Sequence, residues 1–200
     1  MREAARPPTL TGVRRRGTGR VGLEVDGRPW RVVPDEVVVR CGLAAGVELD
    51  RPLLRRLSRE LRRSEALDAA VRTVARRDVA RERLRQRLAA RGVRPASANA
   101  AISALESAGV VDDARLAAAR ARSLAERGWG DAAIVFRLEQ EGIPGTVVGA
   151  AVSGLEPETA RATALAARAR EPRQAWRLLA RRGFAPETIE EAVGALDEER

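Results

Sequence analysis

Arginine dominates the groups in this sequence that could do chemistry, and its spacing over residues 51–91 indicates anion binding. This stretch holds fourteen arginines and five acidic residues, in a 200-residue chain of formal net charge +9. Guanidinium groups bind phosphates and carboxylates through paired hydrogen bonds. Like charges four residues apart destabilise a helix, so this unbalanced run favours contact with DNA phosphates or an acidic protein surface over a solvated helix face. The candidate residues are Arg55, Arg56, Arg59, Arg62, Arg63, Arg76, Arg77, Arg81 and Arg85, and Arg87 continues the same run of charge.

Catalytic chemistry has few candidate groups in this chain. The sequence contains no His and no Tyr, so two common acid–base groups are missing. Cys41 is the single cysteine, which excludes an intrachain disulfide and a thiolate metal cluster, and we interpret it as a small buried residue. Asp112 and Asp113 are adjacent, and helix capping explains them. We therefore expect a protein that is not an enzyme, with no catalytic residue, cofactor or metal.

Tryptophan is the second kind of residue that could contact a partner. Trp129, in the phrase "GWG", falls between two expected helices. Its ring either seals an interface between modules or protrudes as an anchor for a protein, and packing in the core is the favoured interpretation. Trp30 and Trp176 allow the same two interpretations.

The composition favours a helical protein. Hydrophobic residues make up 44% of the chain, but aromatic residues only 2%, so Ala, Leu and Val supply most of the core. Together with Arg and Glu, Ala and Leu are good helix formers. We find no apolar run long enough for a transmembrane helix and no apolar segment of a secretory signal, and we expect a cytoplasmic protein.

The first fifty residues differ from the rest of the chain. Residues 1–20 combine Pro, Gly and Arg, including "RRRGTGR", and predict a disordered or extended basic arm rather than a phosphate-binding loop. Alternating apolar residues around Asp26-Gly27 predict a β-hairpin at about 21–33 within a small appendage at 21–49. "PDEVVVRCGL" has a helix-start signal but a β-branched run, so strand and helix both remain open.

From Asp50, expected to cap the next helix, the apolar spacing is helical throughout. We expect three repeats, at 50–110, 111–156 and 157–200. After a long first helix, the expected helices cover 80–90, 96–108, 112–127, 131–141, 145–154, 158–169, 172–182 and 186–196.

One phrase recurs three times without gaps: a Leu, then a Gly four residues later, then an apolar residue. Its glycines are Gly92, Gly142 and Gly183. We interpret each as a helix ended by a left-handed Gly, with the apolar residue packing back on the helix end. One such helical hairpin buries too little surface alone, so the repeats predict a mostly α fold of tandem three-helix repeats in an elongated array, with the small α+β appendage.

These phrases resemble the RecX family, bacterial regulators of the RecA recombinase built from tandem three-helix repeats. The resemblance covers roughly residues 50–196, and 21–49 more loosely. The order and spacing of the phrases carry it, because each is mostly Leu, Gly and Ala. They are "GVVDDARLAAARARS" (109–123), "ERGWGDAAIVFRLEQEGI" (126–143) and "RRGF" (181–184).

Two positions depart from the family pattern. Ala80 stands where the family has a Ser that caps a helix, and Asp78 could cap that helix instead by starting it earlier. Leu116 stands where the family more often has Phe, which keeps the position apolar. Neither change removes a binding group.

The resemblance implies a monomeric regulator that binds RecA or the groove of the RecA filament on DNA. It would inhibit the ATPase and strand-exchange activities of RecA, which serve homologous recombination and the SOS response. The basic stripe would then contact DNA or an acidic filament wall. The alternative is a helical protein that binds single- or double-stranded DNA without RecA. A structural adaptor would show neither activity.

Overall fold

A computed structural model describes residues 7–198, which form three strands and ten helices. They divide into two compact units, one of residues 7–72 with 88–103 and the other of residues 73–87 with 104–198. Helices α3 (Arg81–Ala90) and α4 (Pro95–Ser107) contribute residues to both units, as does α2 (Arg51–Val74), whose last two residues belong to the second unit. Within residues 7–198, every helix is too short or too polar to cross a membrane.

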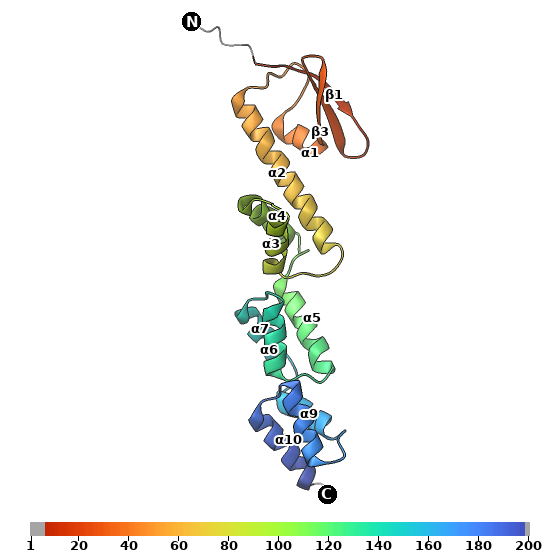
Figure 1. Cartoon of the computed structure of the whole chain (residues 1–200), viewed down its shortest axis with the longest axis vertical. Helices are drawn as coiled ribbons and strands as arrows, with labels where there is room; N and C mark the ends of the chain where they lie inside the picture. The colour runs from red at the N-terminus through yellow and green to blue at the C-terminus, as the bar shows by residue number, and fades with distance from the viewer. Residues whose placement is uncertain (1–6, 199–200) are drawn as a thin grey trace. The chain divides into compact units, whose positions relative to one another are not determined.

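The first unit begins with an antiparallel sheet in the order β1-β2-β3 (Figure 1). Its strands are β1 (Leu10–Arg15), β2 (Arg20–Val25) and β3 (Arg28–Pro34). The predicted hairpin is confirmed as β2–β3. Asp26 and Gly27 form its turn with φ angles of 50° and 76°, the left-handed conformation that a tight hairpin turn requires.

The prediction of a disordered or extended arm at residues 1–20 is wrong for β1, which forms the edge of this sheet. Residues 1–6 of the predicted arm lie outside the described residues. Leu10 is fully buried, and Val13 pairs with Leu23 of β2. A bulge between Leu10 and Gly12 places these apolar residues three positions apart. The strict alternation that identifies a strand in a sequence is therefore absent here.

Two helices complete the core of the first unit. The stretch open between strand and helix is a helix, α1 (Asp35–Cys41), and α2 (Arg51–Val74) follows. Asp50 caps α2 as predicted, because the Leu53 N–H donates to its carboxylate at 2.8 Å. Val37 and Cys41 of α1 pack with Leu57 of α2 and with buried residues of the sheet.

The second unit contains two three-helix groups, visible in turn along the chain in Figure 1. In each group the three helices contact one another. The predicted tandem three-helix fold is confirmed, with each helix within a few residues of its expected bounds. The first group is α5 (Asp113–Glu126), α6 (Asp131–Gln140) and α7 (Gly145–Ser153); the second is α8 (Glu158–Ala166), α9 (Pro172–Arg182) and α10 (Pro186–Glu198).

The recurring Leu–Gly–apolar phrase is the Schellman motif that ends a helix. Gly92, Gly142 and Gly183 have φ angles of 75°, 86° and 75°. In each copy the N–H of the following residue donates to the carbonyl of the Leu four residues before the Gly, at 3.1 to 3.3 Å. The Leu side chains are fully buried. The spacing is therefore fixed by the hydrogen bond and apolar contact that define this motif.

The start of α3 differs from its expected form. Asp78 does not extend the helix, which begins at Arg81. The Arg81 N–H instead donates to the carboxylate of Asp113 at 2.8 Å, from the first turn of α5. Asp112 caps α5 itself by accepting from the Arg115 N–H at 2.9 Å. The adjacent aspartates thus serve two different helices, and a distant residue supplies the cap that Ala80 lacks.

Candidate partner-binding surfaces

The arginines of α2 line a shallow hollow in the first unit. Arg51, Arg55 and Arg62 surround Leu54 and Ser58, and the hollow has a volume of about 380 Å³. Of the other predicted residues on α2, Arg59 and Arg63 are exposed. Three guanidiniums around a small apolar and hydroxyl floor form a positive surface that can accept a carboxylate or phosphate.

Three of the nine predicted arginines have partners within the protein. The Arg56 guanidinium donates to the Arg40 carbonyl at the end of α1. Arg81 lies 3.3 Å from the carboxylate of Glu106, and Arg85 forms an ion pair with Glu82 one turn away. These groups stabilise the fold locally, so they are less available to a partner than the other predicted arginines.

The predicted stripe is split between the two units. Its α2 residues belong to the first, whereas Arg76, Arg77, Arg81 and Arg85 belong to the second. Arg76 and Arg77 are exposed in the turn before α3. Continuity in sequence therefore does not place these nine residues in one compact unit.

Within the second unit, arginines from three segments line one hollow, which we call the arginine hollow. Arg77 precedes α3, Arg83 and Arg87 lie on α3, and Arg120 lies on α5. The hollow has a volume of about 280 Å³, and Asp78, Val79, Ala80, Gln140 and Glu141 complete its lining. Four positive and two negative side chains leave an excess of positive charge, which favours an anionic group of a partner.

The close approach of α3 to the end of α6 builds the arginine hollow. A side chain at Gly142 would lie 3.4 Å from the Glu82 Cβ and 3.5 Å from the Arg83 nitrogen. Arg120 reaches Glu141 at 3.6 Å across the lining, and both side chains are 45% exposed. Such an exposed pair contributes little stability, so Arg120 remains available to a ligand.

Two members of the arginine hollow were not predicted. Arg77 and Arg87 belong to the predicted run of basic residues, whereas Arg83 and Arg120 were not singled out. Arg120 lies in a stretch with little net charge, and only folding brings it next to α3. Gly142 of the "EGI" phrase lies where the end of α6 meets α3, but a Cβ there would make only ordinary contacts with Glu82 and Arg83, so the phrase does not predict the hollow.

Trp129 lies at the joint between the two three-helix groups. Its half-buried ring packs against the core of α5–α7. The guanidiniums of Arg137 and Arg182 lie 3.8 and 4.9 Å from the ring centroid, in cation–π contact. Arg182 comes from the end of α9, so this ring contacts both groups, which corresponds to the sealing role considered above. Trp176 is 41% exposed and Trp30 is 40% exposed.

Glycines let the two groups approach at this joint. The Gly130 N–H donates to the Arg182 carbonyl at 2.9 Å. A side chain at Gly130 would overlap the backbone of Gly183, and one at Gly183 would lie 2.6 Å from the Ala133 Cβ. The phrases "GWG" and "RRGF" are therefore the two halves of one contact.

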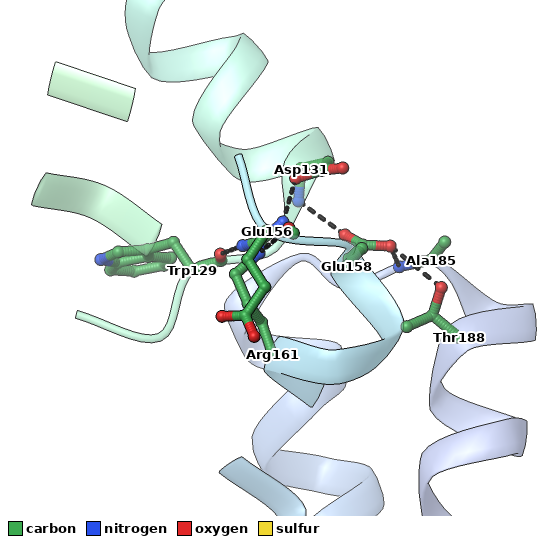
Figure 2. Close-up of polar contacts among 7 residues, drawn as sticks. All are labelled: Trp129, Asp131, Glu156, Glu158, Arg161, Ala185 and Thr188. Carbon is green, nitrogen blue, oxygen red and sulfur yellow. Dashed lines mark hydrogen bonds and ion pairs between the residues drawn. The ribbon is translucent and has the colours of Figure 1, made fainter. Parts of the chain in front are cut away.

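Charged residues of α8 fasten the same joint (Figure 2). The Glu158 carboxylate accepts from the Asp131 N–H at 2.6 Å, the Ala185 N–H at 3.3 Å and the Thr188 hydroxyl at 3.0 Å. It thereby caps the starts of α6 and α10 together. Arg161 donates to the Trp129 carbonyl at 2.8 Å and pairs with the Asp131 carboxylate.

Cys41 lies in the core of the first unit, as its interpretation as a small buried residue predicted. Its residue surface is 4% exposed, and desolvation by burial raises the pKa of its thiol. A thiol held protonated is a poor nucleophile. Among residues 7–198, no three His, Cys, Asp or Glu side chains gather in a way that could hold a metal ion.

Tandem three-helix groups, joined through glycine-ended helices and bearing arginine-lined hollows, define a helical-repeat protein. Residues 112–152 match the family model for the second three-helix domain of RecX. The regulatory protein RecX of Halorhodospira halophila is 35% identical, over 68% of this chain and 91% of its own length. That of Chromohalobacter salexigens is 38% identical, over 63% of this chain and 89% of its own length. The chain belongs to the RecX family, as the resemblance predicted.

Solved structures share the fold. A crystal structure of regulatory protein RecX matches with a TM-score of 0.79 at 18% identity, covering 94% of this chain and 99% of that one. The crystal structure of RecX from Lactobacillus salivarius matches with a TM-score of 0.61 at 16% identity, covering 68% of this chain and 97% of that one.

Proposed function

We propose that this protein is a non-enzymatic, cytoplasmic regulator of the RecA recombinase in recombinational DNA repair. It binds RecA or the RecA filament on DNA and inhibits the ATPase and strand exchange of RecA. The names of its relatives support regulation in general, because those relatives are called regulatory proteins RecX. Its fold supports binding, because tandem helical groups present extended surfaces to macromolecules.

The arginine hollow is the observation that carries this proposal. Its four arginines come from three segments, so the fold gathers them around one hollow, where we expect a single anionic group to bind. A carboxylate of RecA or a phosphate of the bound DNA would pair with them. Charged contacts of this kind accelerate association and select partners of complementary charge.

The hollow on α2 offers a second basic contact. Arg55 and Arg62 line it, with Arg51 from the first turn of the helix. The exposed Arg59 and Arg63 add positive charge to the same helix. We assign this surface to the same filament, on its DNA or on an acidic wall.

The DNA-dependent ATPase of RecA on single-stranded DNA, titrated with this protein, tests the proposal. The native chain is expected to lower the rate in a dose-dependent manner. The double variant Arg83→Gln/Arg120→Gln should require about tenfold more protein for the same effect, corresponding to a loss of about 1.4 kcal/mol of binding free energy. Arg122→Gln is the matched control, because Arg122 is exposed on α5 outside the lining of the arginine hollow.

The outcomes separate the function from its site. Inhibition that the double variant retains in full would keep the function and reject the arginine hollow as the contact. An unchanged ATPase at every ratio, together with tight binding of the protein to DNA alone, would favour the alternative of a DNA-binding protein that acts without RecA.

A further inference from the structure

The outer face of the N-terminal sheet has a composition that the regulatory function does not explain. Residues 10–34 contain six arginines and two acidic residues. The inner face buries Val21, Leu23 and Val33. On the outer face Trp30 is 40% exposed and Val32 is 55% exposed. An exposed aromatic ring within a basic surface is the combination that binds single-stranded nucleic acid in many folds.

The strand register builds a hollow beside this ring, which we call the sheet hollow. Gly22 pairs with Arg14 on one side and with Val32 on the other, so these three positions share one face of the sheet. Because Gly22 has no side chain, the middle of the row is open. The hollow has a volume of about 280 Å³, and its lining includes Trp30, Arg14, Arg16 and Arg31.

The Arg16 side chain lies close to the backbone of Gly22. A Cβ at position 22 would lie 3.0 Å from the Arg16 Cγ and 3.2 Å from its Nε. A larger residue would therefore shift the Arg16 side chain by a few tenths of an ångström and fill part of the open space above Gly22.

The charges around the ring are predominantly positive. The Arg31 guanidinium lies 5.3 Å from the centroid of the Trp30 ring. Arg14 is 3.4 Å from Glu24, but its side chain remains 72% exposed. Three arginines against one glutamate leave an excess of positive charge in the lining beside the exposed ring.

We propose that the sheet hollow binds single-stranded nucleic acid, with one base stacked on Trp30 and the flanking phosphates on Arg14, Arg16 and Arg31. Unpaired bases expose a flat face to an aromatic ring, whereas the bases of a duplex already stack on one another. The volume of the hollow lies near the lower end of the roughly 300–1,000 Å³ of small-molecule pockets, which suits one planar group of a longer ligand. This site is separate from the arginine hollow and does not require RecA.

The test measures binding of the full-length protein to a fluorescein-labelled oligothymidylate of about 12 nucleotides, within the usual range of site sizes. A second probe of the same length has abasic sites in place of the bases. Trp30→Ala should weaken binding of oligothymidylate by about 5- to 100-fold, the range measured for loss of one stacked base. The same variant should change binding of the abasic probe less than about twofold, because the phosphates remain.

Three further variants complete the experiment. Trp176→Ala is the matched control, because Trp176 is 41% exposed and belongs to the second unit. Trp30→Phe should restore most of the affinity for oligothymidylate, since it keeps an aromatic face. Arg16→Gln should weaken binding of both probes and reduce the salt dependence of each. Circular dichroism of every variant monitors the fold.

Several results would overturn the proposal. One is equal affinity of the native protein and Trp30→Ala for oligothymidylate. Another is an equal loss on both probes, because the tryptophan would then act without stacking. Tighter binding of duplex DNA that is insensitive to Trp30→Ala would contradict the preference for single strands. Failure of the native protein to bind either probe at low salt would leave an acidic protein segment as the ligand of this face.

Discussion

Glu158 and Arg161, one turn apart on α8, both bind Asp131, at the start of a helix in the preceding three-helix group. The Glu158 carboxylate accepts the Asp131 N–H, and the Arg161 guanidinium pairs with the Asp131 carboxylate. The side chain of Arg161 is only 8% exposed, so its charge is largely removed from water and depends on these partners. Glu158 and Arg161 therefore determine which residues meet where the two three-helix groups join.

Removal of the Glu158 carboxylate should destabilise the second unit. Glu158→Ala leaves the first N–H of α6, the Ala185 N–H and the Thr188 hydroxyl without this acceptor. Loss of two helix caps is expected to cost about 2 kcal/mol of unfolding free energy. Urea unfolding followed by circular dichroism measures this change. Glu156→Ala is the control, because Glu156 is exposed and contributes its backbone carbonyl to Arg161; an equal loss in both variants would contradict the capping role.

A methyl group at Gly183 should separate the cost of backbone strain from the cost of a clash. Gly183 and Gly92 both have a φ of 75°, but a Cβ at Gly183 would lie 2.6 Å from the Ala133 Cβ, whereas one at Gly92 meets no atom within 4 Å. Gly92→Ala should cost about 1–2 kcal/mol for its left-handed conformation. Gly183→Ala should cost about 1–3 kcal/mol more, because the groups must move apart. Thermal unfolding of both variants gives the comparison, and equal losses would show that the joint adjusts freely.

The cap that Asp113 provides to α3 should depend on an oxygen acceptor rather than on charge. Asp113→Ala removes the acceptor of the Arg81 N–H and should lower the unfolding free energy by about 1 kcal/mol. Asp113→Asn retains a side-chain oxygen that can cap, so most of that stability should return. Chemical denaturation of the three proteins tests this order. If both variants lost the same stability, the contact would be electrostatic.

The buried thiol of Cys41 should make stability fall at alkaline pH. Burial raises its pKa in the folded state, so the folded protein keeps the thiol protonated where the unfolded chain begins to ionise. This contribution is fully present below the ordinary thiol pKa and is lost as the pH rises through the raised value. The stability advantage of the native protein over Cys41→Ala should therefore shrink between pH 7.5 and pH 10, measured by urea unfolding at each pH. A constant difference would contradict the raised pKa.

Most of the helical fold could be predicted because its signals are local. The Leu–Gly–apolar phrase fixes its own hydrogen bond, and Asp50 and Asp112 cap helices that begin next to them. The sheet was harder to predict. β1 has a bulge that interrupts its alternation, and its pairing partner is needed to show that Leu10 and Val13 are core residues.

The binding surfaces could be predicted only in part, because they depend on contacts between distant segments. The charge run identified Arg55 and Arg77, but the local sequence of Arg120 gives no sign that it lines a hollow with α3. Similarly, Arg56 looks like a surface cation in the sequence, and only the fold places the Arg40 carbonyl beside it. The density of charge in the sequence therefore predicted the kind of partner, but it did not predict which individual residues would contact that partner.

The most direct test of the regulatory role compares binding of this protein to the RecA filament and to bare DNA. Fluorescently labelled protein is titrated with RecA filaments on single-stranded DNA, with the same DNA alone and with RecA alone, at physiological salt. The account predicts tighter binding to the filament than to bare DNA, with Arg83→Gln/Arg120→Gln weakening it and Arg122→Gln leaving it unchanged. Equal affinity for bare DNA and the filament, with no binding to RecA alone, would contradict it.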